Sequence, residues 1–557
     1  MTIQSYFSQR PKPSKKQQDA WDQSVAKFIW KDMRPMYAVE GEGFQDMVHA
    51  LDPRCEIKSR ETYLKIVKQH YCQLLLTMKN MLQPVKYFAL STDFWSSIAK
   101  DAYVTVTCHW ITSDWEFEHC CLGTPSVPEK HDAPTVARRV RGLVESFGLV
   151  NDNNSALVTD NAGNVSNAAE ILDTTSVNCF CHTLQLALTQ GLKQPGIARV
   201  LGAVKKLVKH FNKSTRCTME LKVRQERRPG SVPLALIGFN ETRWDSTYDM
   251  GARLLKLKWH VRAILCDERF VKRTDARNLE LRDEHWDLLE RLISFLKPFK
   301  ILSKTMQAQT YATVSLVYPS IIDIKETLLT APEDEPRCMR ELKDNMLAKV
   351  EVEFFFEDWH LSVPVLASCL DPRYKFIKFI PASLRLDVYT KLRTEIKQNY
   401  AASQPAPSDP VPEEPAESDE VVTVAEDLRF GQRFAGATQS ESESDEQEER
   451  RSTSTASSPV DNQFDAFLMT PPEPAKCDPL KWWKKNQTKY DALVPTVMKL
   501  FSIPASSAPA ESIFSSAGHV IRKKRASLLP TNADMLVCLA CNKRFFEELP
   551  PEAVVEV

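Results

Sequence analysis

The sequence lacks an excess of charge of either sign. Its 72 Lys and Arg residues face 73 Asp and Glu residues, which leaves a formal net charge of −1 at pH 7. A uniformly basic chain, the usual electrostatic footprint of a nucleic-acid-binding protein, is therefore excluded. Any affinity for DNA has to come from local basic patches whose charge is cancelled by acidic segments elsewhere.

Long apolar runs are also missing. The first residues, MTIQSYFSQRPKPSKK, contain no apolar core of a signal peptide. No run of about 18 apolar residues occurs, which argues against a membrane span. Without a secretory signal, the 14 cysteines indicate reduced thiols in the cytosol or nucleus. Cys538 and Cys541 form a CxxC pair, but no second Cys or His pair follows at zinc-finger spacing, and one apolar helix face explains the pair more simply.

Changes in composition and periodicity predict the domain organisation. Residues 102–110 alternate with a period of two, as in a strand, whereas residues 17–83 and most of 182–400 repeat with helical periodicity. Residues 401–475 are rich in Pro, Ser and Glu and poor in core formers. The predicted order is a disordered basic tail (1–16), a helical segment (17–83), the first part of an α/β core (84–212), a helical insertion (213–400), a disordered acidic linker (401–475), the end of the core (476–548) and a tail (549–557).

Two aspartates end predicted strands of the core. Short β-type runs over 86–95, 102–110, 114–123, 155–160 and 175–182, with a helix between the third and fourth, predict a mixed five-stranded α/β sheet. Asp93 ends the first run and Asp160 ends the fourth, just before the turn formers Asn161, Gly163 and Asn164. Two carboxylates brought together at strand ends tolerate each other when Mg²⁺ or Mn²⁺ lies between them. The alternative is ordinary turn chemistry, because Asp before Asn-x-Gly is common in turns.

Six motifs in fixed order carry a resemblance to a known family. STDFWSS, VTDNAGN, CFCHTLQLAL, TRWDSTY, LDPRYK and PASSAPAESIFSSAG occur within residues 17–548. Together they resemble the hAT transposase superfamily, and within it the BED-finger-associated (ZBED-like) proteins. The resemblance implies an RNase H-like core interrupted by a large helical insertion. It also implies a catalytic and metal-binding set of Asp93, Asp160 and Glu511, using Mg²⁺ or Mn²⁺ if the protein is active.

The resemblance implies further DNA-contacting residues. Cys179 and His182 in CFCH match a C-x-x-H element near the family's active site, and Arg243 and Trp244 match an Arg-Trp element whose Trp stacks on a flipped base. From the residues alone, Cys179 is a buried small side chain, His182 a helix-start histidine and Trp244 a packing residue. Both interpretations remain open at this point.

Two basic segments and one apolar segment suggest two partners, DNA and a second copy of the chain. Basic residues over 204–228 and the run Arg522, Lys523, Lys524 and Arg525 could neutralise DNA phosphates; a solvated helix face is the alternative for the first, and a nuclear localisation signal for the second. The resemblance implies dimerisation through an apolar segment, which could equally pack on the chain's own core. Its members are Ile513, Phe514, Val520, Ile521, Leu528, Leu529, Leu536 and Leu539.

One feature of the subgroup is not found. BED-type relatives often begin with a zinc finger, but before residue 85 only Cys55 and Cys72 occur, without a ligand set. We therefore expect no structural zinc finger in this chain. Three functions remain: a nuclear, DNA-binding, dimerising protein of transposase descent with a regulatory role; an active transposase with Mg²⁺-dependent strand cleavage; and a protein scaffold that does not touch DNA. Expected partners are DNA and a second copy, with no membrane and no small-molecule cofactor.

Overall fold

The chain folds into two compact units. The computed structural model describes residues 12–96, 100–150, 154–226, 232–240, 243–404, 432–435, 458–513 and 529–547. The first unit, called the sheet unit here, comprises Met1–Cys179, Gln309–Ala312 and Val497–Val557. The second, called the helical unit, comprises Phe180–Ala308 and Thr313–Thr496.

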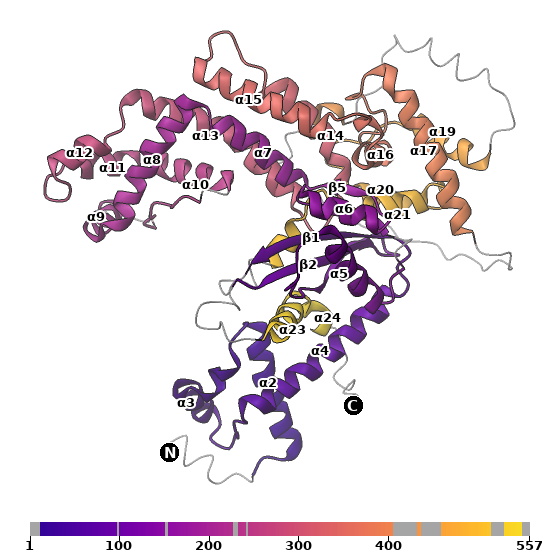
Figure 1. Ribbon diagram of the computed structural model, residues 1–557, viewed down its shortest axis with the longest axis horizontal. Coiled ribbons are helices and arrows are strands. Elements are labelled where there is room, and N and C mark those ends of the chain that lie inside the picture. Colours follow the sequence, from indigo (N-terminus) through magenta and orange to yellow (C-terminus); the bar gives the residue numbers. More distant parts are fainter. Residues whose placement is uncertain are drawn as a thin grey trace. The chain divides into compact units, whose positions relative to one another are not determined.

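A mixed five-stranded sheet forms the centre of the sheet unit (Figure 1). Its strands are β1 (Phe88–Ser96), β2 (Ala102–Ile111), β3 (Phe117–Gly123), β4 (Asn154–Thr159) and β5 (Ser176–Asn178), in the spatial order β3-β2-β1-β4-β5. β1, β2 and β3 form an antiparallel meander, while β4 runs parallel to β1 and β5 parallel to β4. The predicted mixed five-stranded sheet is thus confirmed. The fifth strand is shorter than predicted, because residues from Phe180 onward are helical.

The two faces of the sheet differ in chemistry. Leu90, Val106 and Cys108 belong to the apolar core of the unit. The opposite face, called the polar face here, carries buried Ser91, Thr107 and His109. Ser91 Oγ lies 2.5 Å from Thr107 Oγ1, which lies 2.9 Å from His109 Nε2. This hydrogen-bonded chain satisfies side chains that would otherwise be costly to bury.

The sheet unit also contains helices from both ends of the chain. In order they are α2 (Lys15–Lys31), η1 (Met36–Glu40), α3 (Glu42–Leu51), α4 (Arg60–Leu82), α5 (Ala133–Ser146), α6 (Gly163–Ile171), α23 (Pro530–Cys541) and α24 (Lys543–Glu547), with residues 508–513 also helical. Of these, α5, α6 and α23 pack on the strands. Ser59 is the N-cap of α4, since its Oγ accepts from the Thr62 N–H at 3.3 Å. Gly148 follows the end of α5, with φ of +75°. Because α2 starts at Lys15 with a capping box on Ser14, the predicted tail 1–16 is too long.

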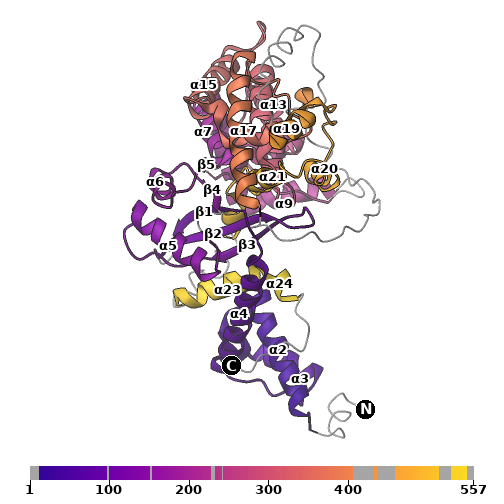
Figure 2. The same ribbon diagram turned by 90° about the vertical axis from the view of Figure 1, so that its right-hand side faces the viewer.

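The late helix α23 packs beside the early helices α2 and α4 and against β3 (Figure 2). The Asn542 side chain after α23 binds the backbone of Cys121 on β3 twice: its Oδ1 accepts from the Cys121 N–H at 3.0 Å and its Nδ2 donates to the Cys121 carbonyl at 2.9 Å. Asp534 Oδ1 accepts from the Thr124 N–H at 2.5 Å. Side chains from α23 and its end thus satisfy backbone groups of an edge strand that would otherwise be open for pairing.

The helical unit contains no strand in its described residues. It comprises α7 (Phe180–Leu192), α8 (Pro195–Lys213), α9 (Thr215–Glu226), α10 (Trp244–Lys256), α11 (Lys258–Leu265), α12 (Arg273–Leu279), α13 (Asp283–Met306), η3 (Val314–Leu316), α14 (Val317–Asp323), η4 (Ile324–Leu328), α15 (Arg337–Phe354), η5 (Trp359–Leu361), α16 (Val363–Leu370), α17 (Ala382–Ser403), η6 (Gln432–Phe434), α19 (Pro459–Met469) and α20 (Pro479–Asn486). α21 (Val494–Phe501) spans the boundary between the units. None of the described helices is both long and apolar enough to cross a membrane.

The LDPRYK motif forms a buried set of ion pairs and hydrogen bonds in the helical unit. Arg373 and Asp371 form a fully buried ion pair at 2.6 Å, and Ser315 Oγ donates to the same carboxylate at 2.7 Å. Lys375 is also buried and donates to the Phe467 carbonyl at 2.8 Å. Buried charges persist only when they are paired and hydrogen-bonded, so these contacts hold α19 against the segment after α16.

Three predicted boundaries are wrong. The sheet unit's first segment ends at Cys179 and not at residue 212, because α7 already packs with α15 inside the helical unit. The helical part begins at Phe180 and not at residue 213. The predicted linker 401–475 contains α19, and residues up to Thr496 belong to the helical unit. The composition predicted too long a linker, because the contacts that bury α19 are long-range and leave no signal in the local sequence.

We predict that Asn542→Ala destabilises the sheet unit by about 2–3 kcal/mol, because it leaves both the N–H and the carbonyl of Cys121 without their side-chain partner. Amide exchange of β3 should accelerate, measured by hydrogen–deuterium exchange. The exposed neighbour Lys543→Ala is the control and should leave β3 exchange unchanged. Unchanged exchange of β3 in the Asn542 variant would contradict the assignment.

We also predict that the sheet unit loses stability between pH 6.5 and 4. Burial lowers the pKa of His70 to about 4 and, with help from Arg544, that of His119 to about 4; burial also lowers the pKa of His109. These histidines are neutral when folded and take up protons when unfolded, so their stabilisation is full above pH 6.5 and fades as the pH falls toward 4. Each contributes a slope of about 1.4 kcal/mol per pH unit within that window.

Urea unfolding followed by tryptophan fluorescence at pH 7, 6, 5 and 4.5 measures this slope. His70→Gln should reduce it by close to one proton, because His70 accepts from Trp30 Nε1–H at 3.0 Å and is buried. Exposed His49→Gln should not change it. A slope independent of His70 would refute the prediction.

Candidate functional site

The strand register aligns Asp93 and Asp160. Ser91 on β1 pairs with Val158 on the parallel strand β4. Continuing that register by two residues sets Asp93 beside Asp160, and the period of two points both toward the polar face. Neighbouring strands lie about 4.8 Å apart, and both carboxylates are partly exposed. β1 runs on to Ser96, so the prediction that this strand ends at Asp93 is wrong. The parallel strand β4 ends at Thr159, directly before Asp160.

A turn with a left-handed residue follows β4. Asp160 Oδ1 accepts from the Ala162 N–H at 3.2 Å, as in an Asx turn. Asn161 has φ of +67°, in the left-handed region. A Cβ added to Gly163 would meet no atom within 4 Å, so the unusual backbone lies at Asn161 and not at the glycine. Turn chemistry and placement of a carboxylate at the sheet edge are thus both present.

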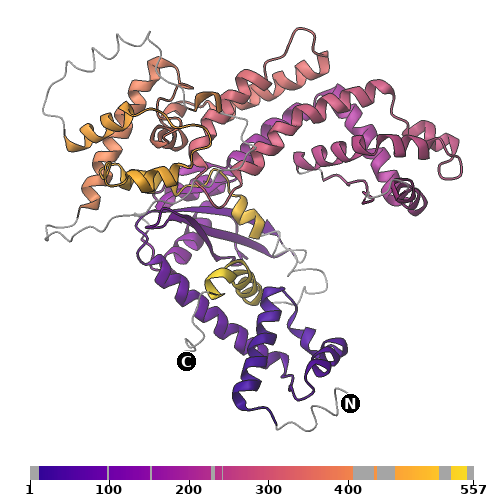
Figure 3. The ribbon, with the colours of Figure 1, turned by 180° about the vertical axis from the view of Figure 1, so that it is seen from behind.

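Glu511 lies on a helical turn that is anchored beside the end of β4. The Cys179 N–H donates to the Thr159 carbonyl at 2.8 Å. The Ser507 N–H donates to Cys179 Sγ at 3.3 Å, so residues 508–513 begin next to the strand that carries Asp160. A cavity of about 310 Å³ is lined by Pro509 and Ser512 of this turn, by His119 of β3 and by Asn542 after α23, among others. Figure 3 shows yellow helical segments from the last part of the chain beside the sheet. All three predicted acidic residues therefore belong to the sheet unit.

The described residues meet only part of what a divalent metal site requires. Carboxylate oxygens are the ligands that Mg²⁺ and Mn²⁺ prefer, and Asp93 and Asp160 would supply them from adjacent strand ends. Within the described residues, no three His, Cys, Asp or Glu side chains form a group placed to hold a metal ion. Asp93, Asp160 and Glu511 as a complete catalytic and metal-binding set thus stays a prediction.

Cys179 has a structural role. It is fully buried, and its Sγ lies 3.4 Å from Ser506 Oγ as well as accepting from Ser507 N–H. This burial favours the interpretation of Cys179 as a buried small side chain, and its contact with DNA stays a prediction. His182 is partly exposed on α7. It belongs to the helical unit, whereas Cys179 ends a segment of the sheet unit.

Trp244 and Arg243 differ in exposure. Arg243 is exposed directly before α10, whereas Trp244, the first residue of α10, has 6% of its surface accessible. The Trp244 N–H donates to Gln185 Oε1 on α7 at 3.2 Å. The burial of Trp244 favours the packing interpretation, and stacking of its ring on a base stays a prediction.

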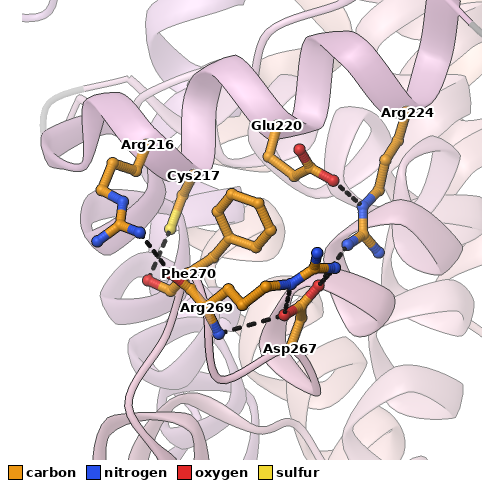
Figure 4. Close-up of polar contacts among 7 residues, drawn as sticks. All are labelled: Arg216, Cys217, Glu220, Arg224, Asp267, Arg269 and Phe270. Carbon is orange, nitrogen blue, oxygen red and sulfur yellow. Dashed lines mark hydrogen bonds and ion pairs between the residues drawn. The ribbon is translucent and has the colours of Figure 1, made fainter.

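The basic stretch 204–228 divides into two parts. On α9, Arg224 contacts Glu220 at 2.7 Å and Asp267 at 3.1 Å, and Arg269 binds the same Asp267 (Figure 4). The Arg269 hydrogen bond lowers the pKa of Asp267 to about 2. These arginines are neutralised by acids and hold α9 to the loop after α11.

On α8, by contrast, the cations form an exposed stripe. The sequence PGIARVLGAVKKLVKHFNK contains no acidic residue. Arg199, Lys206, Lys209 and Lys213 are exposed, while Val204, Leu207 and Phe211 are buried. Spacings of three, four and seven place the four cations on one face over about 21 Å at 1.5 Å per residue. We call this face the α8 stripe. Arg522, Lys523, Lys524 and Arg525 lie outside the described residues.

The predicted dimerisation residues fall into three groups. Leu536 and Leu539 are buried in the core of their own chain, together with Ile513. Leu529 is exposed to 64%. Phe514, Val520, Ile521 and Leu528 lie outside the described residues. Leu536 and Leu539 therefore stabilise one chain, which favours the own-core interpretation for them, and their part in a dimer stays a prediction.

Comparisons with known proteins match several segments. The family model described as the hAT family C-terminal dimerisation region matches residues 460–542. The model of the ZBED1 RNase-like domain matches residues 91–183, and that of the ZBED1 RNase-like helical domain matches residues 177–295. The boundary between these two matches agrees with the boundary between the sheet unit and the helical unit at Cys179.

Whole proteins show the same likeness. A Zea mays protein named as an AC transposase is 25% identical over 90% of this chain and 63% of its own length. Human zinc finger BED domain-containing protein 6 is 25% identical over 93% of this chain and 55% of its own length. A Talaromyces stipitatus protein named as a transcriptional regulator, tpeD, is 20% identical over 98% of this chain and 64% of its own length.

The chain is therefore a hAT transposase-like protein with a hAT C-terminal dimerisation region. Within that superfamily it is similar to the zinc finger BED (ZBED-like) proteins. It spans about 55% to 64% of the length of the three relatives described above.

Sequence reasoning missed the polar face itself. Ser91, Thr107 and His109 line the face on which Asp93 lies. The signal was present, because Thr105, Thr107 and His109 alternate with Val104, Val106 and Cys108 in β2. Such alternation usually marks a solvent-facing side, so burial of the polar side was not foreseen.

We predict that the sheet unit binds Mn²⁺. Asp93→Asn and Asp160→Asn should each lower the Mn²⁺ affinity by more than tenfold, because loss of an outer-shell partner alone costs roughly tenfold. Calorimetry on the full chain measures it. Asp114→Asn, in the exposed turn between β2 and β3, is the matched control and should bind as the wild type does. Equal binding by the Asp160 variant and the wild type would exclude that carboxylate as a ligand.

Proposed function

We propose that the protein is a nuclear, DNA-binding, dimerising protein of hAT transposase descent with a regulatory role. The α8 stripe supports DNA binding, because an acid-free row of exposed cations suits a line of phosphates. The match to the hAT dimerisation region supports self-association. The likeness to a protein named as a transcriptional regulator supports the regulatory part.

The single observation that carries the DNA-binding proposal is the α8 stripe. Whole-chain charge is near neutral, so local geometry has to supply the attraction. Arg224 of α9 is occupied by Glu220 and Asp267, whereas the α8 cations extend from the opposite side of a helix whose apolar side is buried. Phosphate contacts of this kind give affinity without base specificity.

An active transposase is the second candidate function. The alignment of Asp93 with Asp160 on adjacent parallel strands favours it, and an RNase H-like assignment of the sheet unit is supported by the mixed strand order and by the match to an RNase-like domain. A bound Mg²⁺ would supply charge neutralisation at a phosphate during strand cleavage. This chain's own residues would hold that position from the ends of β1 and β4. A protein scaffold that binds no DNA is the outcome to be excluded.

We predict salt-dependent binding to a 30-base-pair duplex, with log K falling linearly as log salt rises. Replacing Lys206, Lys209 and Lys213 by Gln should weaken binding and flatten the slope by about 0.9 for each phosphate that the variant no longer neutralises. Fluorescence anisotropy at 50 to 200 mM salt measures both, a range chosen to span the steep region.

The control removes the same charge from α20, by replacing Lys481, Lys484 and Lys485, which are also exposed. It should keep the wild-type slope. A wild-type slope of zero would favour the scaffold, and equal slopes in the two triple variants would exclude the α8 stripe as the DNA contact.

A further inference from the structure

A short part of the predicted linker lies against the helical unit. Residues 432–435 belong to the stretch predicted as a disordered linker over 401–475. Gln432–Phe434 form the single helical turn η6, which contacts α14. Two neighbouring side chains of this turn, Arg433 and Phe434, make the contacts that matter.

Arg433 binds two acids of the helical unit. Its Nε lies 2.9 Å from Asp323 Oδ1, and its guanidinium also forms an ion pair with Glu326. The Asp323 side chain is 8% exposed and that of Arg433 39%, so the ion pair is shielded from solvent on the side of the aspartate. Charge-assisted contacts of a guanidinium with two carboxylates are strong and directional.

Phe434 adds an aromatic contact beside this ion pair. Its ring lies 5.8 Å from that of Phe379, centroid to centroid, at 69° between planes. The Arg433 guanidinium lies 4.6 Å from the Phe434 ring centroid, so the two side chains stack on each other. The surface therefore recognises a cation and an aromatic ring as one unit.

The backbone of the helical unit is unusual at this position. Asp323 ends α14, and the π-helical turn η4 follows at once and contains Glu326. Single π turns inside helices are rare and occur frequently at functional sites. The neighbouring cation Lys325 is directed to Glu351, at 2.6 Å, so its charge is used elsewhere.

We propose that Asp323, Glu326 and Phe379 form a docking site for an Arg-Phe dipeptide, called the Arg-Phe site here, and that the chain's own Arg433 and Phe434 occupy it. The linker is thereby fixed to the helical unit at one point between α17 and α19. Since the cost of closing a loop grows with its length, this anchor also divides one long connection into two shorter ones.

The chain offers a matched control. The sequence LRFGQRFA contains two Arg-Phe pairs, Arg429–Phe430 and Arg433–Phe434, four residues apart. The control chain carries R429A/F430A. The test chain carries these changes and R433A/F434A, so that the earlier pair cannot replace the later one. The probe is a fluorescein-labelled peptide of residues 431–440, GQRFAGATQS.

Anisotropy titration of the full chains with this peptide tests the proposal. We expect the test chain to bind the peptide at least tenfold more tightly than the control chain, because its Arg-Phe site is vacant. Adding D323N to the test chain should abolish binding, as should Ala in place of both Arg and Phe in the peptide. Circular dichroism spectra and melting temperatures of all chains verify folding.

Two results would overturn the proposal. Equal, tight binding to control and test chains would show that the site is open in the free chain and available to a partner peptide instead. Absence of binding to a folded test chain would show that Asp323, Glu326 and Phe379 do not recognise the dipeptide.

Discussion

The contact between Asn542 and the backbone of Cys121 is the constraint on which the sheet unit depends. One amide side chain satisfies both the donor and the acceptor of an edge-strand residue 421 positions earlier in the chain. α23 packs against β3, where this contact fixes its register, and also beside α2 and α4. The apolar core then contains side chains from both ends of the chain, and Met535, Leu536 and Leu539 are part of it. The segment that matches a dimerisation region is thus also needed to complete one chain.

The helical unit uses the same principle with charges. Asp371, Arg373 and Lys375 are buried, and each is satisfied by a partner from a distant segment or from its neighbour. Removing one member of such a set leaves a charge uncompensated, which costs far more than the contact contributes. The contact of Lys375 with the Phe467 carbonyl explains how α19 is held in the helical unit, although it lies within the stretch predicted as a linker from its composition.

The candidate site also depends on contacts between segments that are distant in the sequence. The parallel register of β1 and β4, continued by two residues, aligns Asp93 with Asp160, and the turn with Glu511 begins beside the end of β4 through Cys179. Cys179 therefore acts through position, as a buried bridge between the end of β4 and Ser507. DNA contact is better supported by the α8 stripe, where exposed cations have no acidic neighbour on their own helix.

The sequence by itself determined the mixed five-stranded sheet and the two candidate aspartates, because these depend on periodicity and on neighbours a few residues apart. The class of protein came from the resemblance of its motifs to a known family. Only the tertiary structure decided the boundary at Cys179, the membership of α19 in the helical unit, the burial of Trp244 and Cys179, and the neutralisation of Arg224. Each of these depends on partners tens to hundreds of residues away. The local sequence pattern shows how apolar a side chain is. The surface that covers this side chain, and the acid that pairs with a given arginine, depend on the tertiary fold.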